Sequence, residues 1–103
     1  MRSFKTLDQY EENYFKERPE EVEAYLEIIF EEYAKDQDLG ALLASLRAVS
    51  RARGISATAE AAGLSRKGLQ KALSTNGNPK FESVAVILRA LGYRLVPEKL
   101  EQL

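Results

Sequence analysis

Residues 59–72, A-E-A-A-G-L-S-R-K-G-L-Q-K-A, constrain the fold more than any other part of this 103-residue chain. Gly63 can take the left-handed backbone conformation that a sharp turn needs, and Ser65 is of a type that caps helix N-termini. Ala59 is small enough for two helices to approach closely, and Leu64 is placed to anchor the turn in the core. The stretch therefore predicts two short helices joined by a tight turn.

The second of these helices is predicted to carry its polar side chains outward. Leu69 and Ala72 face the interior at helical spacing, which leaves four long donors outside: Arg66, Lys67, Gln70 and Lys71. A helix of this kind lies in a DNA major groove, where arginine or lysine recognises guanine and glutamine recognises adenine. We therefore interpret the stretch as a helix-turn-helix. A helical hairpin packed for stability alone is the alternative.

Further donors around the turn are predicted to contact DNA phosphates. Ser56 is predicted to cap the first helix, and the backbone amides there, with Thr58 beside them, are natural phosphate donors. The S-T-N-G-N-P-K segment after Leu73 is predicted to be a loop that contributes further contacts. The predicted DNA-binding residues are Ser56, Thr58, Ser65, Arg66, Lys67, Gln70, Lys71, Asn76, Asn78 and Lys80.

Charge is unevenly distributed along the chain. Residues 1–38 carry 12 acidic and 5 basic side chains, residues 39–103 carry 4 acidic and 10 basic ones, and the formal net charge is -1. A polyanion would be attracted to the second part and repelled by the first, whereas the acidic part suits a basic partner. Two solvated faces without partners are the alternative interpretation.

The segment before the turn is predicted to be helical. Apolar side chains at helical spacing, with capping residues and Pro19 at a helix start, support this prediction. Three helices are predicted: from Leu7 to about Lys16 with Thr6 as its cap, from Pro19 to about Lys35, and from Leu39 to near Arg53–Gly54 with Asp38 as its cap.

The C-terminal part is predicted to hold one more helix and a short strand. The inward stripe of that helix is Phe81, Val84, Ala85, Leu88 and Leu91, and Gly92 ends it. Residues 93–96 alternate like a strand, which must pair with another copy, pair with a different protein, or remain extended coil. The predicted organisation is an acidic helical segment 1–37 packed on the domain, a DNA-binding domain 38–97 and a mobile tail 98–103.

Composition argues against an enzyme. The chain has no cysteine and no histidine, which excludes disulfides, thiol catalysis, zinc sites built on these residues and histidine acid–base chemistry. We predict no catalytic residue, no metal site and no cofactor. No segment approaches the roughly 18 apolar residues of a membrane span and no secretory segment follows the start. We therefore expect a cytoplasmic protein.

Residues 39–96 resemble the phage-repressor type of helix-turn-helix domain, the XRE type. Nearly the whole chain is similar to the HigA-like antitoxins, the addiction-module antidote proteins. The segments that carry the resemblance are E-A-Y-L-E-I-I-F-E-E, L-L-A-S-L-R-A-V-S-R-A-R-G-I-S, A-G-L-S-R-K-G-L-Q-K-A-L-S-T-N-G-N-P-K-F and L-R-A-L-G-Y-R-L. The resemblance implies an all-α fold of five to six helices, here with the short C-terminal β-strand.

The resemblance also implies two partners. Family members neutralise a small basic toxin of the RelE/ParE-like group, and they bind double-stranded operator DNA as homodimers to repress their own operon. The alternatives are a stand-alone helix-turn-helix repressor without a toxin, and a protein-interaction module in which the turn is only structural.

Overall fold

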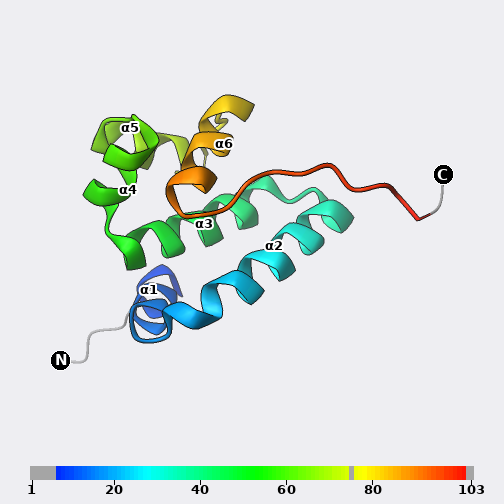
Figure 1. The fold of residues 1–103 in the computed structure, drawn as a ribbon, viewed down its shortest axis with the longest axis horizontal. Coiled ribbons are helices and arrows are strands. Elements are labelled where there is room, and N and C mark those ends of the chain that lie inside the picture. The colour runs from blue at the N-terminus through cyan, green and yellow to red at the C-terminus, as the bar shows by residue number, and fades with distance from the viewer. Residues whose placement is uncertain (1–6, 75, 102–103) are drawn as a thin grey trace.

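The structure, a computed structural model, describes residues 7–74 and 76–101, and every regular element in this part of the chain is a helix (Figure 1). The elements are α1 (Leu7–Glu17), the 3-10 helix η1 (Pro19–Glu21), α2 (Val22–Asp36), α3 (Leu39–Arg53), α4 (Ile55–Ala62), α5 (Arg66–Ala72) and α6 (Phe81–Ala90). The predicted all-α class is confirmed. The predicted cap Thr6 lies outside the described residues.

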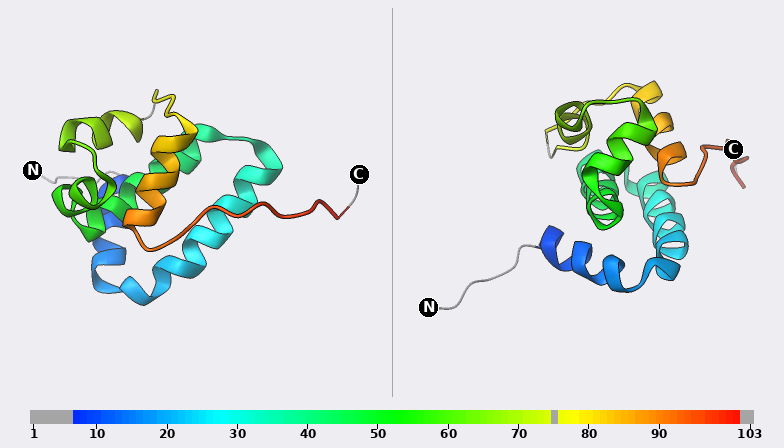
Figure 2. Two further views of the ribbon diagram at one scale, coloured as in Figure 1. Left: turned by 45° about the horizontal axis from the view of Figure 1, so that its top comes forward. Right: turned by 60° about the vertical axis from the view of Figure 1, so that its left-hand side comes forward.

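Helix α3 lies in the middle of the molecule. Helices α1 and α2 pack on one side of it, and α4, α5 and α6 lie on the other side (Figures 1 and 2). The core is continuous across both sides, because buried side chains of α3 contact both groups of helices. Its members include Phe15, Leu26, Leu43, Leu46, Leu69, Leu73, Ile87 and Leu88.

Local sequence explains how the chain enters α2 and α3, and a side-chain cap begins α3. Asp38 accepts a hydrogen bond from the Ala41 amide, 3.1 Å away, and this confirms it as the N-cap of α3. Pro19 begins a single 3-10 turn rather than α2 itself, which starts at Val22. Tight turns of this kind are frequent at helix N-termini.

Side-chain contacts fasten the corner between α1 and α2. The Tyr14 hydroxyl donates to Glu21 at 2.6 Å, and the Tyr25 hydroxyl donates to Glu11 at 2.9 Å. The Arg18 guanidinium lies 4.3 Å from the centre of the Tyr14 ring, a cation–π contact. The hydrogen bond to Glu21 raises the pKa of Tyr14 above its ordinary value.

The predicted C-terminal strand is wrong for the single chain. Residues 93–96 are extended, but no strand forms in the described residues, which offer no second strand for a ladder. The half-buried Tyr93 and Leu95 pack instead against the helical core, and the chain continues across α3 toward the end of α2 (Figure 1). Burial raises the pKa of Tyr93, and the nearby Glu23 carboxylate adds to the shift.

The predicted inward stripe of α6 is wrong at its first residue. Phe81 is 77% exposed, whereas Leu88 and Leu91 are buried as predicted. Phe81 is the first residue of α6 and directly follows the exposed Lys80, so it is not enclosed by the core. Ile87, outside the predicted stripe, is fully buried, because the core encloses more of α6 than one narrow stripe.

Ser50 is a polar side chain in the apolar core. It is 0% exposed, and its Oγ has no hydrogen-bond partner in the described part of the chain. We expect Ser50→Ala to raise the free energy of unfolding by about 1 kcal/mol, because a buried hydroxyl without a partner carries an uncompensated desolvation cost. Thermal or urea unfolding measures the change.

Ser45 provides the matched control on the same helix. It is also buried, but its hydroxyl donates to the Ala41 carbonyl at 3.1 Å. Both substitutions gain the same helix propensity. Because Ser45→Ala also removes a hydrogen bond, it should raise the free energy of unfolding less than Ser50→Ala does. Equal effects would contradict the assignment of Ser50 as an uncompensated hydroxyl.

Candidate functional site

The turn between α4 and α5 forms as the sequence predicts. Gly63 has φ 73°, the left-handed conformation, and its amide donates to the Glu60 carbonyl at 3.1 Å. The Leu64 amide donates to the Ala59 carbonyl at 2.9 Å, and these bonds satisfy the free carbonyls at the end of α4. Leu64 is half-buried against the core.

Ser65 caps α5, as predicted. Its backbone is extended, and its Oγ accepts a hydrogen bond from the Gly68 amide at 2.9 Å. The hydroxyl hydrogen remains available to donate elsewhere. Leu69 is 0% exposed and holds the inner face of α5 in the core.

The four long side chains predicted to face outward from α5 do so. Arg66, Lys67, Gln70 and Lys71 are all exposed. Arg66 Nη1 lies 3.5 Å from Ser56 Oγ, a long contact that joins the first turns of α5 and α4. The first turn of α5 thus presents cations to solvent next to the start of α4.

Two predictions about α4 are wrong. Ser56 is exposed, but it is the second residue of α4 and not its cap, because Gly54 with φ 108° ends α3 and begins α4 within one residue. Thr58 is 3% exposed, so its hydroxyl is not presented to a phosphate. The spacing of Ile55, Thr58, Ala59 and Ala62 is that of an inward helical stripe, a signal that would have placed Thr58 in the interior.

The loop after α5 presents the other predicted side chains. Asn76, Asn78 and Lys80 are exposed, and α4, α5 and this loop lie on the same side of α3 (Figure 2). We call the exposed set the α4–α5 surface. Its members are Ser56, Ser65, Arg66, Lys67, Gln70, Lys71, Asn76, Asn78 and Lys80.

Gly77 shapes this loop by close packing. A Cβ built there would lie 2.8 Å from the Ala72 carbonyl oxygen, 2.9 Å from that of Ser74 and 3.1 Å from that of Lys71. The Gly77 amide also donates to the Ser74 carbonyl at 2.8 Å. Only a residue without a side chain lets the loop fold this tightly onto the end of α5.

We expect Gly77→Ala to lower the free energy of unfolding by about 1–3 kcal/mol, because the new methyl group forces backbone oxygens to move. Gly40→Ala is the control, since its Cβ would meet Asp38 Oδ1 at an ordinary 3.5 Å within a helix. That control should be stabilising by roughly 0.5–1 kcal/mol. Equal and small changes in Tm for both variants would contradict the steric role of Gly77.

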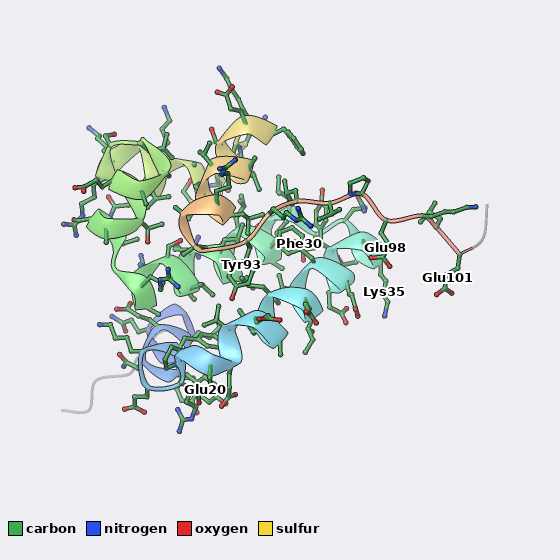
Figure 3. The ribbon with its side chains drawn as sticks, viewed as in Figure 1. Glu20, Phe30, Lys35, Tyr93, Glu98 and Glu101 are labelled. Atoms are coloured by element: carbon green, nitrogen blue, oxygen red, sulfur yellow. The ribbon has the colours of Figure 1, made fainter. Side chains whose placement is uncertain are left out.

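The acidic helices lie away from the α4–α5 surface. Glu20 and Lys35, both on the side of α1 and α2, are far from α4 and α5 in Figure 3. Helix α2 exposes Glu23, Glu27, Glu31 and Glu32. The charge asymmetry of the sequence therefore becomes a separation in space, with α3 between the two parts.

One contact to this surface was not predicted from the sequence. Arg47 on α3 donates from Nη1 to the Leu73 carbonyl oxygen at the end of α5, 2.6 Å away. The sequence places Arg47 on the polar side of α3, but no local sequence pattern identifies a hydrogen-bond partner 26 residues away.

The described residues form neither a candidate metal site nor a membrane-spanning helix. Within residues 7–74 and 76–101, no group of three or more acidic, cysteine or histidine side chains is placed to hold a metal ion. None of the helices in this part of the chain has the length and apolar character needed to cross a membrane.

Comparison with known proteins places the chain in one family. Residues 6–99 match the family described as "Probable addiction module antidote protein". A protein of Haemophilus influenzae described as "Uncharacterized protein" is 42% identical over 72 residues, which are 70% of each chain. No solved structure matches this chain significantly.

Proposed function

This chain belongs to the family of probable addiction module antidote proteins, and we propose that it is the antitoxin of a type II toxin–antitoxin module. In this proposal it neutralises a small basic toxin of the RelE/ParE-like group and represses its own operon as a homodimer. The α4–turn–α5 unit acts as a helix-turn-helix of the phage-repressor type in a HigA-like protein.

The cations on α5 are the observation that carries the proposed DNA binding. Arg66 and Lys67 lie in the first turn of a capped helix, and Lys71 lies one turn beyond Lys67. All three are exposed. In a recognition helix, the first turn approaches base edges, while neighbouring donors bind phosphates and set the orientation.

A homodimer explains how so small a surface reaches specificity. Two copies related by a two-fold axis place two recognition helices about 34 Å apart, one turn of the duplex. The operator is then expected to be palindromic. Sedimentation of the purified chain measures the oligomeric state, and a monomer at micromolar concentration would contradict this part of the proposal.

DNA binding is tested with a labelled duplex from the region upstream of the gene for this chain. We expect an association constant that falls steeply with salt, because cations on the protein displace counterions from the phosphates. A scrambled duplex of the same length should bind more weakly. Equal binding to both duplexes, or none to either, would overturn the repressor role.

The toxin partner is tested by co-expression with the neighbouring reading frame. We expect a basic protein of about domain size to co-purify with this chain, since the exposed carboxylates of α2 attract positive charge. Co-expression should also relieve its toxicity. DNA binding without any such complex would indicate a stand-alone repressor.

A further inference from the structure

Helix α5 is held at its two ends in different ways. At its start, the N-cap Ser65 accepts a hydrogen bond from the Gly68 amide at 2.9 Å, a contact within the helix itself. At its end, Arg47 Nη1 donates to the carbonyl oxygen of Leu73, the C-cap residue of α5, at 2.6 Å. The second bond spans 26 residues of sequence and connects α5 directly to the central helix α3.

The hydrogen bond from Arg47 to Leu73 is of a strong type, which suits it to hold the end of α5 in place. A guanidinium donor is charged, and charge-assisted hydrogen bonds are shorter and stronger than neutral ones. The acceptor lies at a helix C-terminus, where the macrodipole favours a cation. Arg47 is half-buried, so water screens the attraction less than it would at an exposed position.

A short helix needs such an anchor. Helix α5 has seven residues, and helices of this length are not stable by their own hydrogen bonds. Leu69 on its inner face and the side chain of Leu73 at its end are buried in the core, but apolar contacts are not directional. The bond from Arg47 fixes the far end, where Lys71 and the loop with Asn76 begin.

We propose that Arg47 is a positioning residue for DNA recognition, and this inference rests on the proposed function. Arg47 sets the placement of α5 on α3 and thereby the placement of Lys71 and the following loop, without contacting DNA itself. Binding groups must be held within about 0.5 Å of their productive positions by such supporting contacts, so loss of the anchor lowers specific affinity.

Arg47→Met tests the proposal in the full-length chain, because methionine keeps part of the apolar stem and removes every donor. We expect the affinity for the upstream duplex to fall about tenfold, because DNA binding must then order the end of α5 that the hydrogen bond held in place. The slope of log K against log[salt] should stay unchanged. Arg47→Lys, which keeps a charged donor, should recover part of the loss.

The salt slope separates positioning from direct contact. A phosphate ligand contributes about 0.9 to the slope, so a slope reduced by that amount in Arg47→Met would overturn the proposal. Unchanged affinity in the folded variant would also overturn it. Lys35→Met on α2 is the charge-matched control, since Lys35 lies far from α5 (Figure 3) and its removal should change neither quantity.

Amide hydrogen exchange provides a measurement that needs no DNA. In Arg47→Met, we expect faster exchange at the end of α5, at Ala72 and Leu73, with α1 and α2 unchanged. Unchanged exchange in α5 would overturn the positioning role even if the wild-type chain binds DNA. If the wild-type chain binds no DNA but the exchange of Ala72 and Leu73 is faster in Arg47→Met, the role of Arg47 in DNA recognition is rejected together with the proposed function. The structural role of Arg47 in holding the end of α5 is then still supported.

Discussion

Replacing Arg66, Lys67 and Lys71 together by alanine is expected to lower the affinity for the upstream duplex by about a thousandfold or more. Each well-placed donor to a base edge contributes about 1–3 kcal/mol, and 1.4 kcal/mol is about a tenfold change. The three side chains are exposed and alanine is a strong helix former, so the fold is expected to remain. Fluorescence anisotropy over a range of salt concentrations measures the loss, and thermal unfolding checks the fold.

A second triple variant controls for the change in net charge. Lys35, Arg94 and Lys99 are exposed cations outside the α4–α5 surface, and their replacement by alanine removes the same charge. We expect that variant to bind the duplex within about threefold of wild type, because charges beyond a Debye length of about 10 Å are largely screened. Equal losses in both variants would show that net charge, and not the α4–α5 surface, drives binding.

Leu69→Ala is expected to have the largest effect on stability. The side chain is 0% exposed and belongs to the core cluster that joins α5 to α3 and α6. Leucine-to-alanine substitutions in cores cost about 2–5 kcal/mol through lost burial and the cavity left behind. Because domains of this size are stable by only about 5–15 kcal/mol, we expect a large drop in the urea midpoint.

The neighbouring position gives the matched control. Gln70 is exposed, and Gln70→Ala is expected to change the free energy of unfolding by no more than about 0.5 kcal/mol. Leu69→Ala tests the inner face of α5, which packs in the core, and Gln70→Ala tests its outer face. We expect Gln70→Ala to lower the affinity for DNA more than it lowers the free energy of unfolding. A destabilisation by Gln70→Ala as large as that by Leu69→Ala would contradict the placement of α5.

The separation of charge across α3 has a consequence for DNA approach. Helix α2, which exposes several carboxylates, lies on the side of α3 away from α4 and α5 (Figure 1), so a phosphate backbone is repelled from one side of the molecule and attracted to the other. Such a field orients a protein as it approaches a charged partner. In the proposed antitoxin, the acidic side then stays available to a basic toxin while the α4–α5 surface is on the operator.

Some features follow from chemistry within a few residues. The turn at Gly63, the cap at Ser65 and the cap at Asp38 are confirmed, because a left-handed glycine or a capping side chain depends on its immediate neighbours. One error arises where two local signals compete. Ser56 is a good capping type, but Gly54 already separates α3 from α4 and leaves no cap position for it.

Other features depend on what covers a residue in the folded chain. Phe81 has the spacing of a core residue, yet it is 77% exposed because it begins α6 outside the packed interior. Residues 93–96 have the alternation of a strand, but a strand needs a partner, and the described chain packs Tyr93 and Leu95 on helices instead. The periodicity of apolar residues describes a single helix or strand, whereas the burial of a residue depends on the other elements that pack around it.

The amino-acid sequence by itself determined the helical class, the turn before α5, the outward direction of its cations and the uneven charge along the chain. These follow from backbone conformation, capping and spacing, which act over one or two turns. Only the tertiary structure decided that α3 separates the charges in space, that Gly77 closes on the end of α5 and that Arg47 reaches Leu73. Those contacts join residues distant in sequence, and their geometry exists only after the helices have packed.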